Sequence, residues 1–201
     1  MLDSTLTGLV TGLSLIIAIG AQNAYVLRQG LAREHVGGVV LVCTLSDVAL
    51  IVAGVAGIGT IVEEAPWALT VVRWLGVAFL GWYGVSSLLR ARRTESLRVN
   101  GNGGTTSRRA ALGRAVALTW LNPHVYLDTV LLLGSVANHQ GSSGRWWFAL
   151  GACVASALWF TGLGYGARLA SRVLASPRAW QVLDVVIGVL MLVIAVRLAT
   201  G

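Results

Sequence analysis

Charged residues are scarce in this sequence. They make up only 11% of its 201 residues, whereas hydrophobic residues make up 56%. Soluble domains contain about 25% charged residues, and the mean hydropathy here is +0.75. This composition excludes an ordinary soluble domain and is typical of a protein that crosses a membrane several times.

Lysine is absent, since all 15 basic residues are arginines. The pI of about 10.7 would by itself suggest a nucleic-acid-binding protein. The arginines form no binding face, however, because they lie between long apolar runs, where basic residues orient a chain in the membrane. We therefore expect a lipid bilayer around this chain and no nucleic acid.

Cysteine is almost absent as well, with Cys43 and Cys153 as the two thiols. Both lie within apolar runs, so neither suggests a disulfide or a pair of metal ligands. We expect no cofactor.

Six apolar runs are long enough to cross a bilayer. About 20 residues of helix span the hydrocarbon layer of ~30 Å, and a helix satisfies its own backbone groups there. The predicted spans are Leu6–Leu27, Val36–Val62, Leu69–Leu89, Ala115–Ala137, Trp146–Leu169 and Trp180–Leu198. The sequence therefore predicts an all-α, polytopic membrane protein with six transmembrane helices.

The positions of the arginines predict the orientation of these helices. The loops after the first, third and fifth spans contain twelve arginines, and the opposite side contains three. Basic residues favour the cytoplasmic side of a membrane. We therefore expect those three loops in the cytoplasm and both termini outside it.

The whole chain is predicted to be one transmembrane transporter domain with a cytoplasmic linker at residues 91–113. The centre of this linker is rich in glycine, asparagine and threonine, which is typical of a flexible connection. The Cys-x-x-Ser pattern at Cys43 recurs at Cys153. We therefore expect two three-helix repeats, residues 1–90 and 114–201. Because three is odd, the repeats would be inverted, as in many transporters.

Two of the spans contain a helix-breaking residue beside uncharged amides. Gly20 precedes Gln22 and Asn23 in the first span, and Asn122 precedes Pro123 in the fourth. Proline breaks or kinks a helix and glycine loosens one. Backbone groups freed in a membrane must be buried in protein or line a cavity. We expect a substrate site at the paired breaks; the alternative is two kinked helices packed by polar residues without a ligand.

The predicted boundaries place both breaks on the cytoplasmic side of the membrane midplane. An inverted repeat should place one break on each side. A fourth helix that begins near Ser107, rather than at Ala115, would remove this conflict.

Three carboxylates, Asp47, Asp128 and Asp184, lie within predicted spans. An acidic side chain at the centre of a membrane helix costs about 2.5–3.5 kcal/mol. Proteins that keep one there usually use it to handle an ion, a proton or a charged substrate. Asp184 lies nearest a helix end, where pairing with an arginine is an equal alternative.

Asp128 follows His124 by four residues, so the two share one helix face. Burial favours the neutral form of a carboxylate, and an adjacent cation favours the charged form. Asp47 and Asp128 could therefore exchange a proton for a cationic substrate. His124 would be either a proton relay or a neutral hydrogen-bonding group. Two possible metal ligands on one helix are weak support for a metal site.

Several of these segments together resemble the LysE-type basic amino acid exporters. The matching motifs are IGAQN (19–23), RQG (28–30), CTLSD (43–47), TWLNPHVYLD (119–128), GRW (144–146) and SP (176–177). The resemblance covers nearly the whole chain. It implies export of L-lysine and L-arginine across the bacterial plasma (inner) membrane, driven by the proton motive force, by a protein that forms homodimers.

The residues and the resemblance agree on a cationic substrate. Asp47 and Asp128 would bind its side chain, and Gln22, Asn23, Asn122 or helix N-termini would bind the rest of the amino acid. Related exporters carry neutral amino acids or heavy-metal cations, which remain the alternative substrates. An intramembrane enzyme would need a nucleophile or a fuller set of metal ligands, so we expect a transporter rather than an enzyme or a purely structural subunit.

Overall fold

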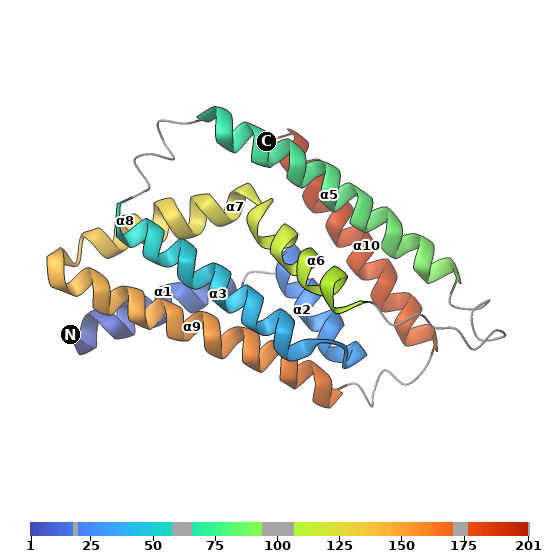
Figure 1. Cartoon of the computed structure of the whole chain (residues 1–201), viewed down its shortest axis with the longest axis horizontal. Coiled ribbons are helices and arrows are strands. Elements are labelled where there is room, and N and C mark those ends of the chain that lie inside the picture. The colour runs from blue at the N-terminus through green and yellow to red at the C-terminus, as the bar shows by residue number, and fades with distance from the viewer. Residues whose placement is uncertain (18–19, 58–65, 94–106, 171–176, 201) are drawn as a thin grey trace.

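The computed structural model describes residues 1–17, 20–57, 66–93, 107–170 and 177–200. Nearly all of these residues are helical, and no strand occurs among them (Figure 1). Four helices are each long and apolar enough to cross a membrane: α3 (Val36–Val55), α5 (Pro66–Arg93), α9 (Gly141–Ala170) and α10 (Pro177–Thr200). Two pairs of shorter helices raise the number of candidate spans to six if each pair is one bent span. The predicted all-α membrane class is confirmed.

The first bent span joins α1 (Leu2–Ile16) to α2 (Ala21–Ala32) at an angle of 82°. Gly20 is the N-cap of α2 and has extended backbone angles, φ −115° and ψ 174°. Within the described part of the chain, no side chain caps the start of α2. The positive end of the α2 helix dipole therefore lies at the break.

The second bent span begins with α6 (Arg108–Trp120) and continues at an angle of 59° through α7 (Pro123–Val125), the π-helical η1 (Tyr126–Leu133) and α8 (Gly134–Asn138). Pro123 is the first residue of α7, where the missing N–H of proline removes no helix hydrogen bond. The Asn122 side chain accepts a hydrogen bond from the His124 backbone N–H at 3.2 Å. The proline and this cap together restart the helix in a new direction.

The fourth span begins earlier than the predicted Ala115. α6 starts at Arg108, and Ser107 is its N-cap. The Ser107 hydroxyl accepts a hydrogen bond from the Ala110 N–H at 3.3 Å. A start near Ser107 is the boundary that an inverted arrangement requires.

Part of the predicted linker at residues 91–113 is helical. Residues 91–93 end α5, and residues 108–113 begin α6. Residues 94–106 lie outside the described residues, as do residues 58–62 at the end of the second predicted span.

Each bent span packs against a straight helix from the other half of the chain. α1 and α2 contact α9, whereas α6 and η1 contact α3. α3 also contacts α9, and α5 pairs with α10 (Figure 1). Glycines allow α1 and α2 to pack closely against the backbone of α9. A methyl group at Gly8 would overlap the Phe148 carbonyl oxygen, and one at Gly30 would overlap the Gly164 carbonyl oxygen.

The main core lies between α2, α3, α5, α6, α9 and α10. Tyr25, Tyr83 and Phe160 are among its largest fully buried side chains. The rings of Tyr25 and Tyr83 pack edge to face with centroids 5.9 Å apart. The Tyr25 hydroxyl also donates a hydrogen bond to the Ala111 carbonyl at 3.0 Å. These contacts hold α2 against α5 and α6.

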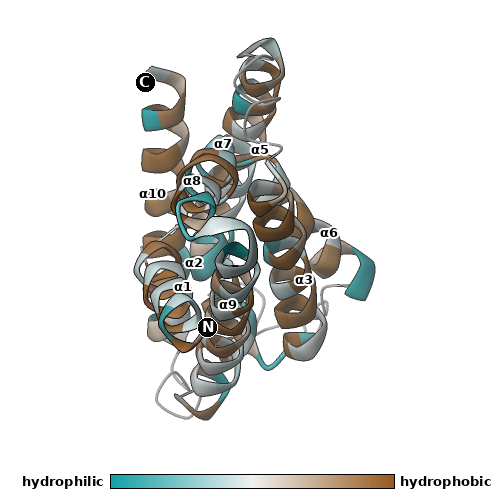
Figure 2. Cartoon of the chain, turned by 90° about the vertical axis from the view of Figure 1, so that its left-hand side faces the viewer, coloured by the Kyte–Doolittle hydropathy of each residue, from teal (hydrophilic) through white to brown (hydrophobic). Residues whose placement is uncertain are grey.

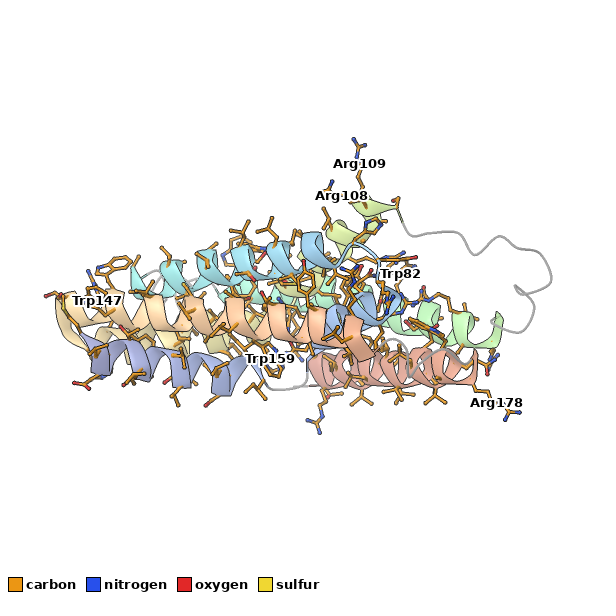
Figure 3. All side chains as sticks on the ribbon, turned by 90° about the horizontal axis from the view of Figure 1, so that it is seen from below. Trp82, Arg108, Arg109, Trp147, Trp159 and Arg178 are labelled. Atoms are coloured by element: carbon orange, nitrogen blue, oxygen red, sulfur yellow. The ribbon has the colours of Figure 1, made fainter. Side chains whose placement is uncertain are left out.

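Many large apolar side chains are exposed along the helices, as contact with lipid requires, and long stretches of several helices are coloured as hydrophobic in Figure 2. One face of α10 presents exposed valines at helical spacing: Val182, Val186, Val189, Val193 and Val196. Arg108 and Arg109 project from the start of α6, and Arg178 lies at the opposite end of the molecule from Trp147 (Figure 3).

Candidate functional site

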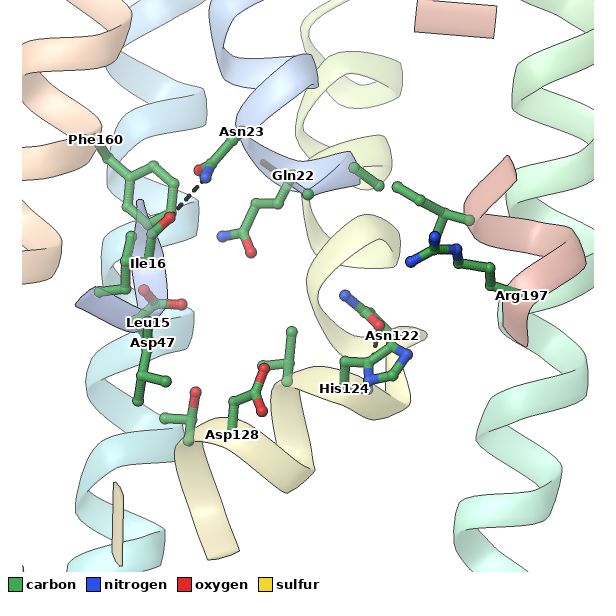
Figure 4. Close-up of a pocket in the computed structure, with 15 residues that line it drawn as sticks. Leu15, Ile16, Gln22, Asn23, Asp47, Asn122, His124, Asp128, Phe160 and Arg197 are labelled. Carbon is green, nitrogen blue, oxygen red and sulfur yellow. Dashed lines mark hydrogen bonds between the residues drawn. The ribbon is translucent and has the colours of Figure 1, made fainter. Parts of the chain in front are cut away.

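A cavity of about 310 Å³ lies beside the two helix breaks (Figure 4). It is lined by Leu15, Ile16, Gly20, Ala21, Gln22, Asn23, Asp47, Asn122, His124, Val125, Asp128, Thr129, Phe160, Ile194 and Arg197. These residues come from both bent spans and from α3, α9 and α10. The volume lies at the lower end of the range of small-molecule sites, about 300–1,000 Å³.

The cavity brings together seven of the eight site residues predicted from the sequence. They are Gly20, Gln22, Asn23, Asp47, Asn122, His124 and Asp128. The eighth, Pro123, instead lines a second cavity of about 380 Å³ that His124 and Arg197 also line. The two breaks, which are about a hundred residues apart in the sequence, therefore face a common space.

Asp47 lies on α3 and is 7% exposed. Its Oδ2 accepts a hydrogen bond from the Ser156 hydroxyl of α9 at 2.8 Å. No arginine forms an ion pair with it among the described residues. A buried carboxylate ordinarily needs a cationic partner, so this cavity wall is suited to a ligand that supplies one.

The start of α2 forms the wall of the cavity next to Asp47. The Gln22 side chain extends toward Asp47 (Figure 4). Its Nε2 is buried and has no hydrogen bond of normal geometry within the described residues. The first turn of α2, which no described side chain caps, adds the positive end of the helix dipole. This side of the cavity is therefore suited to a negatively charged group.

The Asn23 side chain forms hydrogen bonds within the protein, which differs from the expectation that it binds a ligand. Its Nδ2 donates to the Ile16 carbonyl at 2.6 Å, and its Oδ1 accepts from the Trp159 indole N–H at 3.3 Å. The side chain thus connects the end of α1 to α9 across the break. Asn23 lines the cavity, but its hydrogen-bonding groups stabilise the bend.

Asp128 and His124 reach the cavity from the restarted fourth span. Both side chains are exposed, and Asp128 lies in the π-helical segment η1. π-Helical turns are rare and occur frequently at functional sites. In the part of the chain that the structure describes, no group of three or more His, Cys, Asp or Glu side chains is placed to hold a metal ion.

Arg197 and Phe160 are cavity residues that the sequence patterns did not indicate. Arg197 comes from the last turn of α10, and its guanidinium points toward the cavity (Figure 4). Phe160 is an apolar wall residue of α9. Nothing local in the sequence distinguishes either residue, because one resembles a terminal topological arginine and the other an ordinary core aromatic.

Asp184, whose role the sequence left open, lies away from this cavity. Its Oδ1 is 3.1 Å from the Arg28 Nε and 3.7 Å from the Arg90 Nε. The residue is 5% exposed. The three side chains, which we name the ion triad, connect α10 to α2 and α5.

Comparisons with known proteins agree over nearly the full length of the chain. The family model described as "LysE type translocator" matches residues 13–201. The "Lysine exporter LysE" of Corynebacterium diphtheriae is 40% identical in an alignment that covers 96% of this chain and 97% of that protein. The "Arginine exporter protein ArgO" of Salmonella schwarzengrund is 38% identical over 199 residues, which cover 99% of this chain and 94% of that protein. No solved structure matches the chain significantly.

Proposed function

The chain belongs to the LysE-type translocator family, a family of transporters and not of enzymes, and we propose that it exports L-arginine and L-lysine across the bacterial plasma membrane. The two relatives named above are a lysine exporter and an arginine exporter. Their similar identities to this chain do not favour one of the two substrates.

The observation that supports a cationic substrate best is the environment of Asp47. This carboxylate is buried in the cavity wall with a neutral hydroxyl as its hydrogen-bond donor. Asp128 faces the same cavity (Figure 4). A guanidinium or ammonium group between the two would have anionic partners in place of the water that it loses.

The rest of the amino acid would lie toward the start of α2. Gln22 Nε2 and the backbone N–H groups after Gly20 can donate hydrogen bonds to the substrate. The Asn122 amide, which also caps α7, lines the cavity from the other break. Asn23 would hold the break in shape rather than contact the substrate.

We also propose coupling to protons through the same acids. A carboxylate in such a site can hold a proton while the cavity is empty and release it when a cation binds. Asp47 and Asp128 would then exchange protons from outside for a basic amino acid from inside. His124, which is exposed in the cavity wall, would relay protons.

The packing supports a proposal of two inverted three-helix repeats. In each half, the bent span contacts the middle helix of the other half, and the two middle helices contact each other. The third helices, α5 and α10, likewise pair with each other. We propose that the arginine-rich loops are cytoplasmic and that both termini lie outside the cytoplasm.

Uptake of radiolabelled arginine into everted membrane vesicles tests the export function. Vesicles with the protein should take up arginine faster than vesicles without it, and a protonophore should abolish the difference. The Asp128→Asn variant should lose most of this uptake at equal protein level. Uptake of neutral amino acids or of metal cations in place of arginine and lysine would assign the alternative substrate class.

A further inference from the structure

The cavity has opposite charges on opposite sides. Asp47 and Asp128 lie on one side and the Arg197 guanidinium on the other, with Gln22 and Asn122 between them (Figure 4). Within the described residues, neither acid forms an ion pair with Arg197. The charged groups are therefore separated across the space that a ligand would occupy.

Arg197 is not needed to satisfy the end of its own helix. Basic side chains near a helix C-terminus commonly bind the last carbonyl groups. Here Arg73 of α5 takes that position, because its Nε donates to the Leu198 carbonyl at 2.5 Å and its Nη2 to the Ala199 carbonyl at 2.9 Å. The Arg197 guanidinium makes no hydrogen bond or ion pair to another described residue, and it faces the cavity instead.

We propose that Arg197 binds the α-carboxylate of the substrate and thereby selects amino acids over basic amines. This inference rests on the export function proposed above. A guanidinium binds a carboxylate through two parallel N–H···O hydrogen bonds. Arginine and lysine have a cation at the end of the side chain and a carboxylate at the other end of the molecule, in the same order as the charges across the cavity.

The Gln22 amide and the first turn of α2 would assist Arg197 from a neighbouring wall. They are neutral donors, so they orient the carboxylate but discriminate less against a neutral group in its place. Among the described lining residues of this cavity, Arg197 is the only arginine, and no lysine occurs. The selectivity for an anionic group should therefore depend mainly on Arg197.

Competition between arginine and L-argininamide isolates this interaction. Argininamide keeps the side chain and the α-amine but replaces the carboxylate with a neutral amide. Each unlabelled compound is used to inhibit uptake of radiolabelled arginine into everted vesicles, at a pH that keeps both α-amines protonated. The parent protein is compared with Arg197→Gln, Arg197→Lys and the control Arg178→Gln, which removes an exposed arginine from the other end of the same helix.

The parent should bind arginine more tightly than argininamide by at least about tenfold, the value of one charge-assisted hydrogen bond. In Arg197→Gln the inhibition constant of arginine should rise by a similar factor, while that of argininamide should change little. The ratio of the inhibition constant of argininamide to that of arginine should therefore fall toward one. Arg197→Lys should have an intermediate ratio, because it keeps the charge but not the paired donors. Arg178→Gln should keep the parental ratio.

A ratio that is unchanged in both Arg197 variants would overturn this assignment while leaving arginine export intact. An equal loss of affinity for both compounds would overturn it as well, because it would indicate a structural role for Arg197. A parent protein that does not transport arginine at all would instead overturn the proposed function, and this inference with it. If Arg197→Gln does not reach the membrane, the Arg197→Lys ratio alone decides the outcome.

Discussion

Asp47 and Asp184 are equally buried acids with different partners. Asp47 is 7% exposed and Asp184 is 5% exposed, and each lies on a long membrane helix. Asp184 has two arginines within 4 Å, whereas Asp47 has the hydroxyl of Ser156 at 2.8 Å. The charge of Asp184 is therefore neutralised by the protein, and the charge of Asp47 is not.

This difference separates a structural acid from a candidate binding acid more clearly than burial does. A buried charge that the protein pairs internally holds helices together. A buried charge beside a cavity, paired only with a neutral donor, favours a ligand of opposite sign. Four predictions test whether the two acids differ in this way.

Asp47→Asn should have the largest effect on transport. Asn keeps the size of the side chain but removes the charge, and losing one member of a desolvated charge pair costs several kcal/mol. Arginine export normalised to protein in the membrane should fall by orders of magnitude, while the amount of protein stays near the parental level. Near-parental export by Asp47→Asn would place the binding site elsewhere.

Asp184→Asn should reduce the amount of folded protein rather than the rate at which each folded molecule transports arginine. The substitution leaves two arginines without their shared anion, which at a fully buried pair costs about 3–5 kcal/mol. The cost should be lower here, because the Arg90 side chain is 34% exposed. Thermal unfolding of the purified protein in detergent provides the measurement.

The matched controls for this prediction are Arg28→Gln and Arg90→Gln. Each removes one of two cations and leaves an ion pair, so each should destabilise less than Asp184→Asn. Arg90→Gln should be the milder, since Arg90 is the more distant partner at 3.7 Å. If Asp184→Asn loses export without losing stability, the ion triad has a direct role in transport and the contrast with Asp47 fails.

Pro123→Ala tests the cavity without changing either acid. Alanine restores a backbone N–H and favours a continuous helix through Leu121 and Asn122. Export should fall by about tenfold or more, the equivalent of about 1.4 kcal/mol, with normal insertion. Transport at the parental rate would mean that the Asn122 cap maintains the break without the proline.

Ser156→Ala should have the smallest effect of the four. It removes the hydroxyl that donates to Asp47 but keeps the carboxylate. A typical hydrogen bond contributes about 0.5–1.5 kcal/mol, so the apparent affinity for arginine should weaken by about fivefold. The control is Ser46→Ala at the matching position of the other Cys-x-x-Ser pattern. Ser46 accepts a hydrogen bond from the Trp120 indole N–H, and among the described residues its hydroxyl does not donate to Asp47. Equal effects of the two serine variants would contradict a specific role for Ser156.

Much of the membrane architecture could be predicted from local sequence. Apolar runs of about 20 residues indicate spans because burial in lipid depends on composition alone. The breaks near Gly20 and at Pro123 follow from the backbone chemistry of these two residues. The start of α6 was harder to locate, because Arg108, Arg109 and Arg114 interrupt the apolar pattern without ending the helix.

The sequence by itself thus determined the membrane class, the two helix breaks and the acids within the spans, because hydropathy and backbone restriction act within a few residues. Only the tertiary structure decided how those acids differ. Arg28 and Arg90 reach Asp184, Ser156 reaches Asp47, Asn23 supports a break, and Arg197 faces the acids across the cavity. Each of these relations joins helices that are distant in the sequence, and the free energy of a buried charge depends on which helix supplies its partner.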